Sequence, residues 1–181
     1  MKFSVRRGLF ETNSSSSHSL TVKNNWKPDP NVDYTSKFRI KDNCVLVDMS
    51  YATPTECTNW GEYAQKEFKT PEQKLALAIR MCSGNGQDTL NEMKNCGEYC
   101  EFHEIMEVLK KYVKCDDIII DGLEYRSESK YPEDSSDAYI YPYRFDDDIC
   151  TLIDYLRKMG ITLEQMLLDD SIICVSSYEC Y

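Results

Sequence analysis

The residues best suited to chemistry lie in one polar run near the N-terminus. Four consecutive serines, Ser14 to Ser17, are followed directly by His18. A hydroxyl beside an imidazole can supply a nucleophile and its general base. Catalysis also needs an acid that orients the histidine, and the spacing identifies no such acid. An enzyme acting on phosphate esters or nucleotides is therefore an alternative and not the leading interpretation.

The same run has the composition of an anion-binding loop. Hydroxyls, amides and free main-chain N–H groups form concave anion sites, and two arginines lie just upstream. Such residues also favour turns, because they hydrogen-bond their own backbone. A structural loop over residues 12–19 is the leading interpretation, and an anion or nucleic-acid contact is the second. The candidates for that contact are Arg6, Arg7, Asn13, Ser14, Ser15 and His18.

Two cysteines and a histidine have a spacing that could suit zinc. Cys96, Cys100 and His103 would lie on one face of a helix as three soft ligands. The usual zinc pattern has two short ligand pairs separated by a loop, and this sequence lacks it. We therefore expect packing cysteines with a surface histidine, and neither a metal nor a cofactor.

A partner-binding surface is predicted in the acidic, tyrosine-rich part of the chain between residues 124 and 148. Tyrosine is enriched at protein interfaces, and the carboxylates around it can imitate the charge of a phosphate backbone. The alternative is a solvated acidic loop, with the three aspartates stabilising the start of a helix through its dipole. The expected partner-binding residues are Glu128, Tyr131, Glu133, Asp134, Asp137, Tyr139, Tyr141, Asp146, Asp147 and Asp148.

Charge is distributed unevenly along a chain whose net charge is −10. Residues 1–43 hold eight Lys/Arg against four Asp/Glu, whereas residues 115–181 hold five against sixteen. The chain as a whole is repelled by nucleic acid and attracted to basic grooves. A DNA-contacting accessory protein remains a further alternative, through the basic side chains of Lys2, Arg6, Arg7, Lys23, Lys37, Arg39 and Lys41.

Length and patterning predict one α+β domain over residues 1–181. The sheet should be mixed and mainly antiparallel, with helices packed on one side. The expected parts are a β-rich segment 1–50, a helical middle 60–114 and a strand–helix–strand segment 115–181. Neither a signal peptide nor an apolar run near the ~20 residues that span a bilayer is present. We expect a cytoplasmic protein with no membrane partner.

Local signals give the individual elements. The strongest is a helix over 71–82, because Thr70, Pro71 and Gln73 form a capping box. The other expected elements are strands at 2–10, 20–22, 37–41, 44–49, 117–120, 138–143 and 171–176, and helices at 61–68, 97–113, 145–159 and 163–168. Asp42 and Asn43 should form a hairpin turn, Gly160 should end the helix 145–159, and Thr162 should cap the helix 163–168. The helix 97–113 should carry an apolar stripe of Phe102, Ile105, Met106, Leu109 and Val113.

The opening motif resembles one found in a family of small proteins of Firmicutes phages and prophages. Residues 6–19 read RRGLFETNSSSSHS, and weaker likeness continues at Thr70–Ala76 and at Gly160–Glu164. Among such proteins the chain is similar to a type II-A anti-CRISPR, an inhibitor of Cas9. That resemblance implies binding to Cas9 or to its complex with guide RNA, and a block of target DNA recognition or cleavage without catalysis.

Overall fold

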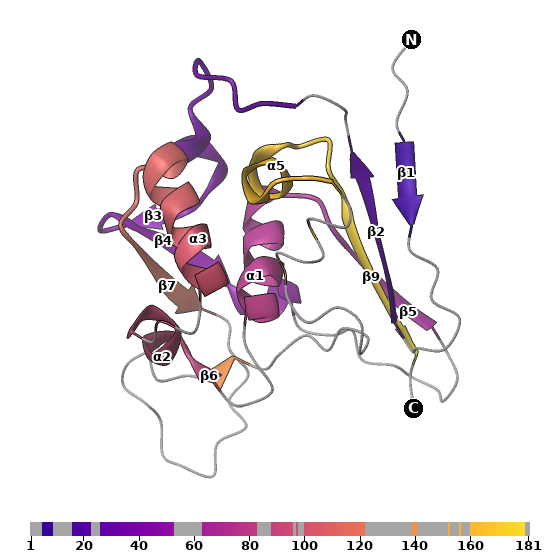
Figure 1. Ribbon diagram of the computed structural model, residues 1–181. Helices are drawn as coiled ribbons and strands as arrows, with labels where there is room; N and C mark the ends of the chain where they lie inside the picture. The colour runs from indigo at the N-terminus through magenta and orange to yellow at the C-terminus, as the bar shows by residue number, and fades with distance from the viewer. Residues whose placement is uncertain are drawn as a thin grey trace.

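The computed structural model describes residues 5–8, 16–22, 26–52, 63–82, 88–95, 97, 100–121, 139–140, 152, 156 and 160–179. Within this part the predicted α+β class is confirmed: helices pack against strands whose pairing is mostly antiparallel. The described strands are divided among three sheets of four, three and two strands. Figure 1 shows the two larger sheets on opposite sides of a helical layer.

The four-stranded sheet has the order β1-β2-β9-β5 and is antiparallel throughout. Leu20 of β2 is in register with Cys174 of β9, which is in register with Phe68 of β5. Phe68 and Cys174 are buried, so these two positions face the core. The bounds are Val5–Gly8 for β1, Ser16–Val22 for β2, Tyr63–Phe68 for β5 and Cys174–Glu179 for β9.

Two sequence-based predictions in this sheet are wrong. Residues 16–19 belong to strand β2 and not to a polar loop, and residues 63–68 form strand β5 and not a helical run. Both strands pair with β9, the last strand of the chain. Pairing with so distant a partner overrides the local preference of serine for turns and of Ala, Gln, Lys and Glu for helices.

The second sheet has the order β3-β4-β7, with β3–β4 antiparallel and β4–β7 parallel. Asp42 and Asn43 form the predicted two-residue hairpin turn, with φ of 50° and 63°. A third sheet joins β6 and β8. The bounds are Ile40–Lys41 for β3, Cys44–Asp48 for β4 and Asp117–Asp121 for β7. In the two-stranded sheet they are Asp88–Thr89 for β6 and Tyr139–Ile140 for β8. Short 3-10 turns cover Tyr34–Lys37 and Met49–Ala52.

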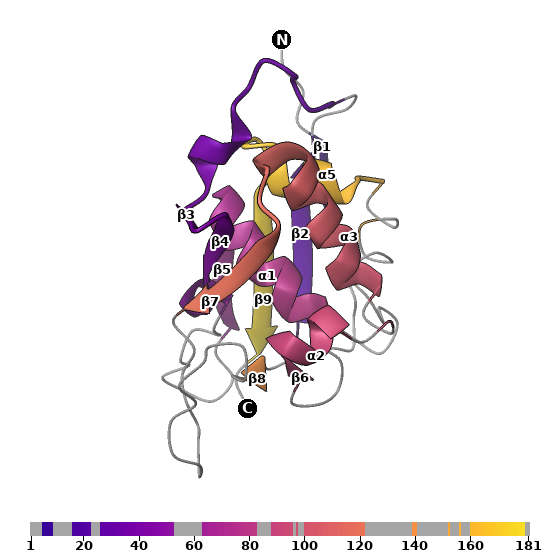
Figure 2. The ribbon, with the colours of Figure 1, turned by 90° about the vertical axis from the view of Figure 1, so that its left-hand side faces the viewer.

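Helix α1, Pro71–Cys82, is the centre of the fold. It contacts β4 of one sheet, β5 of the other, and helices α3 and α5, and Figures 1 and 2 both show it between the two sheets. The predicted capping box is confirmed, since the Gln73 N–H donates to Thr70 Oγ1 (3.2 Å) and the Thr70 N–H donates to Gln73 Oε1 (3.1 Å). Most of its residues are buried, so α1 is enclosed on nearly all sides.

The remaining described helices are α2 (Leu90–Asn95), α3 (Cys100–Val108) and α5 (Leu163–Leu168). A π-helical turn, Leu109–Val113, continues α3. The predicted helix 145–159 lies mostly outside the described residues, but Leu152 and Leu156 are buried. The core therefore joins both ends of the chain to its middle. In the described part, no helix is long and apolar enough to cross a membrane.

Candidate functional site

The candidate site is built around the π-helical turn that ends the α3 helix. The predicted apolar stripe of Phe102, Ile105, Met106, Leu109 and Val113 is buried throughout. The turn keeps Leu109 and Val113 in the core while Lys110 and Lys111 remain exposed. Single π turns inside helices are rare and are frequent at functional sites. The turn therefore places two lysines side by side at the end of a firmly packed helix.

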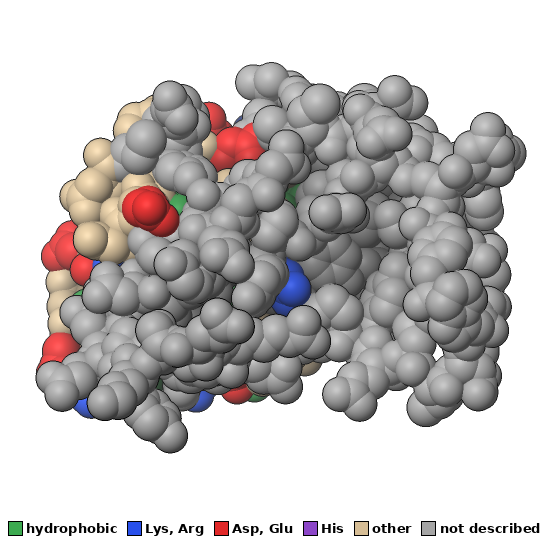
Figure 3. Space-filling view, turned by 90° about the horizontal axis from the view of Figure 1, so that it is seen from below, with side chains coloured by type: hydrophobic (Ala, Val, Ile, Leu, Met, Phe, Trp, Pro, Cys, Tyr) green, Lys and Arg blue, Asp and Glu red, His purple; other side chains and the backbone are tan. Residues whose placement is uncertain are grey.

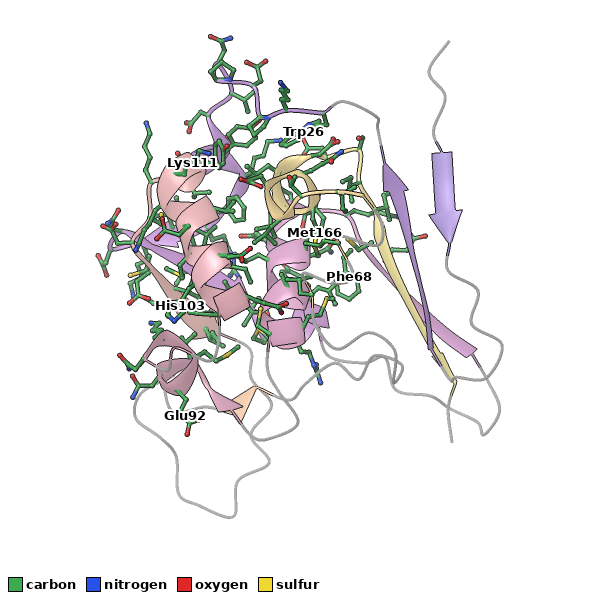
Figure 4. The ribbon with its side chains drawn as sticks, in the orientation of Figure 1. Trp26, Phe68, Glu92, His103, Lys111 and Met166 are labelled. Atoms are coloured by element: carbon green, nitrogen blue, oxygen red, sulfur yellow. The ribbon has the colours of Figure 1, made fainter. Side chains whose placement is uncertain are left out.

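Two hollows lie on either side of Lys111, which lines both of them. Figure 4 labels Lys111 at the end of the helix beside the 26–37 segment, with His103 farther along the same helix. The first hollow, the groove, has a volume of about 890 Å³ and lies between α3 and the start of α5. The second, the cleft, has about 720 Å³ and lies between the π-helical turn and residues 27–35. Both volumes lie in the range of ligand sites in proteins.

The groove has an apolar floor and a charged rim. Val108, Ile161 and Leu163 are buried at its base, together with Leu156. Among the described residues, the rim carries three carboxylates and two ammonium groups, and Glu107 pairs with Lys110 at 3.6 Å. Within this set, acidic side chains outnumber basic ones around an apolar depression. The rim residues are His103, Glu104, Glu107, Lys110, Lys111, Thr162 and Glu164.

The start of α5 is held in place at the edge of the groove. The Gln165 N–H donates to Thr162 Oγ1 at 3.1 Å, which is the predicted N-cap. Gly160, with φ of 68°, ends the preceding segment as predicted, and the Ile161 N–H donates to the Leu156 carbonyl. Glu164 stands in the first turn of α5, where the helix dipole favours a carboxylate. This wall of the groove is therefore fixed by main-chain and capping contacts.

The cleft combines lysines with two tyrosine rings. The Tyr34 and Tyr112 rings meet edge to face, with centroids 6.1 Å apart. The Tyr34 hydroxyl accepts a hydrogen bond from the Asp29 N–H at 2.9 Å, which orders the 27–35 segment internally. The Lys111 ammonium lies 4.8 Å from the Tyr112 ring centroid. Hydrogen bonding to Tyr112 raises the pKa of Lys111, so this lysine is charged at neutral pH.

Lys114 ends the turn in an unusual backbone conformation. Its φ and ψ are 60° and 34°, the left-handed region that glycine adopts without strain. A lysine held there costs stability, and such strain is often retained for a function. Lys27, Lys111 and Lys114 are all exposed in the cleft, and none of them forms an ion pair within the part of the chain described.

The structure places only some of the residues that the sequence singled out. Arg6 and Arg7 lie in β1, His18 lies in β2, and Tyr139 lies in β8 in register with Thr89. The other candidates lie outside the described residues: Asn13, Ser14, Ser15, Glu128, Tyr131, Glu133, Asp134, Asp137, Tyr141, Asp146, Asp147 and Asp148.

Pairing within the four-stranded sheet changes the interpretation of the serine run. The main chain of Ser16–Ser19 pairs with β9, and that of Ser19 also with Gly8 of β1. The predicted loop therefore does not extend over residues 16–19, while residues 12–15 of it lie outside the described part of the chain. The register does bring His18 opposite Ser176 of β9, and Ser176 opposite Lys66 of β5.

Two of the basic residues proposed for DNA contact are paired with carboxylates. The Lys37 ammonium pairs with Asp170, and Arg39 Nε donates to Glu72 Oε1 at 3.1 Å. The Lys37 ammonium also lies 5.6 Å from the Tyr34 ring centroid. These contacts connect the 34–39 segment to α1 and to the end of α5. They give both side chains a structural role.

The zinc hypothesis was not favoured from the sequence, and the structure adds little to it. Cys96 lies outside the described residues, while His103 is exposed at the rim of the groove, with its ring 6.3 Å from that of Phe102. Across the described residues, no group of three or more His, Cys, Asp or Glu side chains is arranged to hold a metal ion.

Sequence reasoning did not identify the lysines and glutamates of the two hollows as a site. Lys110, Lys111 and Lys114 fit an ordinary interpretation, because cations are favoured at a helix C-terminus. Lys27 is more than eighty residues away in sequence, so its place beside Lys111 depends on the tertiary fold. The grouping of three lysines at the C-terminal end of the apolar stripe was the only local signal.

Comparison with known protein families, with curated proteins and with solved structures found no match to this chain.

Proposed function

We propose that this chain is a phage-derived inhibitor that binds Cas9 in the cytoplasm of a bacterial host and blocks target DNA recognition or cleavage. It acts without catalysis, by occupying a groove of Cas9 that is lined with basic residues. The N-terminal motif suggests the partner, and the charge of the chain suggests the mode of binding. Sixteen of its 31 acidic residues lie in residues 115–181, against five basic ones.

The groove is the observation that best supports this proposal. Glu104, Glu107 and Glu164 surround a floor of buried aliphatic side chains. An arginine or lysine of a partner can lay its hydrocarbon stem on such a floor while its charged end meets the carboxylates. Seen from below, the molecule also exposes acidic side chains on the side of α2 (Figure 3), where Glu92 is exposed. Acidic character is therefore present outside the segment 124–148.

Electrostatic attraction explains how such a protein competes with DNA. Complementary charge mainly raises the association rate, and salt screens this effect. A carboxylate-rich surface placed on the basic path of the DNA removes the cations that the phosphates need. Inhibition then depends on occupancy alone and needs no substrate turnover.

The test is binding to purified Cas9, with and without guide RNA, at 50 mM and 300 mM salt as working concentrations chosen around the physiological ~0.15 M. We expect a complex at low salt that weakens as salt rises, together with inhibition of DNA cleavage. Replacing Glu104 and Glu107 by Gln should weaken binding by roughly tenfold in total. Glu67→Gln is the matched control, because Glu67 is exposed on β5 and lines neither hollow. A protein that fails to bind either form of Cas9 at low salt would refute the proposal.

A second candidate function is supported by the register of the four-stranded sheet. His18, Ser176 and Lys66 occupy one cross-strand row of the main-chain register. A histidine beside a serine is the minimum for nucleophilic attack on a phosphate ester. Incubation with p-nitrophenyl phosphate tests this alternative: release of nitrophenol that His18→Ala abolishes would support an enzyme in place of the inhibitor.

A further inference from the structure

We propose that the cleft between residues 27–35 and the π-helical turn is a phosphate-binding site for nucleotides, either within single-stranded nucleic acid or free in solution. The inference concerns a different surface and a different ligand from the Cas9 interaction, and does not depend on it. It rests on three lysines that line one hollow, on the backbone strain at Lys114, and on the size of the hollow.

The three lysines approach the cleft from two distant parts of the chain. Lys27 comes from the N-terminal segment, while Lys111 and Lys114 come from the π-helical turn. Tyr34 and Tyr112 hold the two parts together through their edge-to-face contact at 6.1 Å, and the Asp29 N–H donates to the Tyr34 hydroxyl within the N-terminal segment. Each ammonium is a compact charge with three donors, and lysine is a common phosphate ligand. The fold therefore assembles a local cationic site on a chain of net charge −10.

Two carboxylates line the same cleft and limit its affinity. Asp29 Oδ1 accepts from the Asn31 main-chain and side-chain N–H groups, at 2.9 and 3.0 Å. Asp33 Oδ1 accepts from the Thr35 N–H at 3.0 Å, and hydrogen bonds from Thr35 lower the pKa of Asp33, with a smaller contribution from Lys114. Among the described residues that line the cleft, three lysines against two aspartates leave an excess of one positive charge. We therefore expect modest affinity that is sensitive to salt.

Phosphate fits this arrangement better than a simple carboxylate ligand. A phosphate group presents several oxygens to separate donors, so it can contact lysines on both walls at once. The volume of about 720 Å³ leaves room for a sugar and base beside the phosphate. Duplex DNA is too wide to enter such a hollow, which favours a single strand or a free nucleotide.

The competing explanation is that these lysines only stabilise the C-terminal end of the helix. Lys114 separates the two explanations, because its left-handed backbone suits glycine. If the lysine serves stability alone, Lys114→Gly should leave ligand binding unchanged. If it serves ligand binding, Lys114→Gly should raise the denaturation midpoint and weaken phosphate binding in the same protein.

The experiment titrates a labelled single-stranded RNA with the protein and follows its fluorescence anisotropy. The RNA has about 12 nucleotides, a length within the site sizes of proteins that bind single strands. ATP, inorganic phosphate and a glutamate-rich peptide serve as unlabelled competitors. Lys27→Gln and Lys111→Gln should each weaken binding by roughly fivefold and lower the salt slope by about 0.7 for each lost phosphate contact. Asp33→Asn keeps the capping side chain and should tighten binding by a similar factor.

Lys110→Gln is the matched control, because Lys110 is the neighbour of Lys111, lines only the groove and pairs with Glu107. The affinity of the Lys110→Gln variant for the RNA should stay within about twofold of that of the native protein. This is well below the change expected when a lysine that contacts phosphate is replaced. Binding of RNA indicates nucleic acid as the source of the phosphate, and binding of ATP alone indicates a free nucleotide. The proposal is overturned if no phosphate compound binds, if the acidic peptide competes as well as RNA, or if Lys110→Gln and Lys111→Gln have equal effects.

Discussion

The ammonium of Lys74 is buried completely in the centre of the molecule, and it donates to the main-chain carbonyl of Asp169 at 2.8 Å. Lys74 lies in the first turns of α1, and Asp169 is the C-cap residue of α5. The contact puts a cation at the C-terminal end of a helix, where the dipole favours positive charge. One charged hydrogen bond thus joins the central helix to the last helix of the chain.

The groups around Lys74 offset only part of the energetic cost of burying its ammonium. Burial lowers the pKa of Lys74, and the nearby groups Cys174, Asp170 and Asp169 restore part of it. Asp169 Oδ1 accepts from the Ser171 N–H and hydroxyl, at 2.9 and 2.7 Å, while its Oδ2 atom is buried without a hydrogen-bond partner among the described residues. The core therefore holds a buried ammonium near a carboxylate oxygen that lacks a hydrogen-bond partner among the described residues. Buried charges are often replaceable by apolar side chains of similar volume.

Two substitutions at Lys74 should consequently have different effects on the free energy of unfolding. Lys74→Ala removes the aliphatic stem and the hydrogen bond from the ammonium to the Asp169 carbonyl, which then accepts only from the Ile172 N–H. We expect a loss of roughly 2–4 kcal/mol. Lys74→Met keeps the volume and removes the desolvated charge, and we expect a change within about 1.5 kcal/mol. Urea denaturation of both variants measures the difference. Equal losses would show that the ammonium itself, and not the packing, holds α1 to α5.

Cys174 gives a second prediction, on stability at alkaline pH. Burial raises the pKa of its thiol from 9.0 to about 12, an effect that Lys74 partly opposes. Between these values the unfolded chain loses a proton that the native protein keeps, so this residue makes stability fall as pH rises. Lys74 acts oppositely, because its lowered pKa makes stability rise as pH approaches 10.5.

Replacing either Cys174 or Lys74 should leave the contribution of the other residue to the pH dependence of stability. Cys174→Ala should be less destabilised by a rise from pH 8 to pH 10 than the native protein, and Lys74→Met should be more destabilised by it. The quantity to compare is the slope of the free energy of unfolding against pH, because each substitution also changes the packing and so shifts the free energy at every pH. Chemical denaturation under reducing conditions tests both, and a Cys174→Ala slope equal to the native one would contradict the assignment.

The capping box of α1 gives a third prediction. Thr70 and Gln73 each donate to and accept from the other, and Gln73 Oε1 also accepts from the Lys69 N–H at 2.8 Å. Thr70→Ala should lower the free energy of unfolding by about 1 kcal/mol. Gln73→Ala should cost a similar amount, and the double variant should cost less than the sum, because either change breaks the reciprocal pair. Strict additivity of the two losses would show that the side chains act independently.

This cap also shows which parts of the fold a sequence can reveal. The bounds of α1 follow from Thr70, Pro71 and Gln73, which act within a few residues of one another. The hairpin turn at Asp42 and Asn43 and the cap at Thr162 are likewise local, and they were predicted correctly. The strand β5 was not, because its residues favour a helix until β9 supplies a partner more than one hundred residues away.

The candidate site was harder to predict for the same reason. Lys27 and Lys114 acquire a common role only when Tyr34 and Tyr112 bring their segments together. The groove likewise needs α3 beside the start of α5. The charge totals predicted an acidic molecule, but they could not predict a basic cleft formed from residues of two distant segments.

The hairpin turn between β3 and β4 provides the last prediction. Asn43 has φ of 63°, its side-chain Nδ2 donates to Asp116 Oδ2 at 2.6 Å, and its carbonyl accepts from the Asp116 N–H at 3.2 Å. Asn43→Ala should lower the free energy of unfolding by roughly 1–2 kcal/mol, because it loses the side-chain hydrogen bond and adds strain at positive φ. Asn43→Gly loses the same hydrogen bond without the strain, so it should be the more stable of the two variants by about 1 kcal/mol. Thermal denaturation of the pair measures this difference directly. An Asn43→Gly variant no more stable than Asn43→Ala would mean that the hydrogen bond to Asp116, and not the left-handed backbone, explains why asparagine suits this turn.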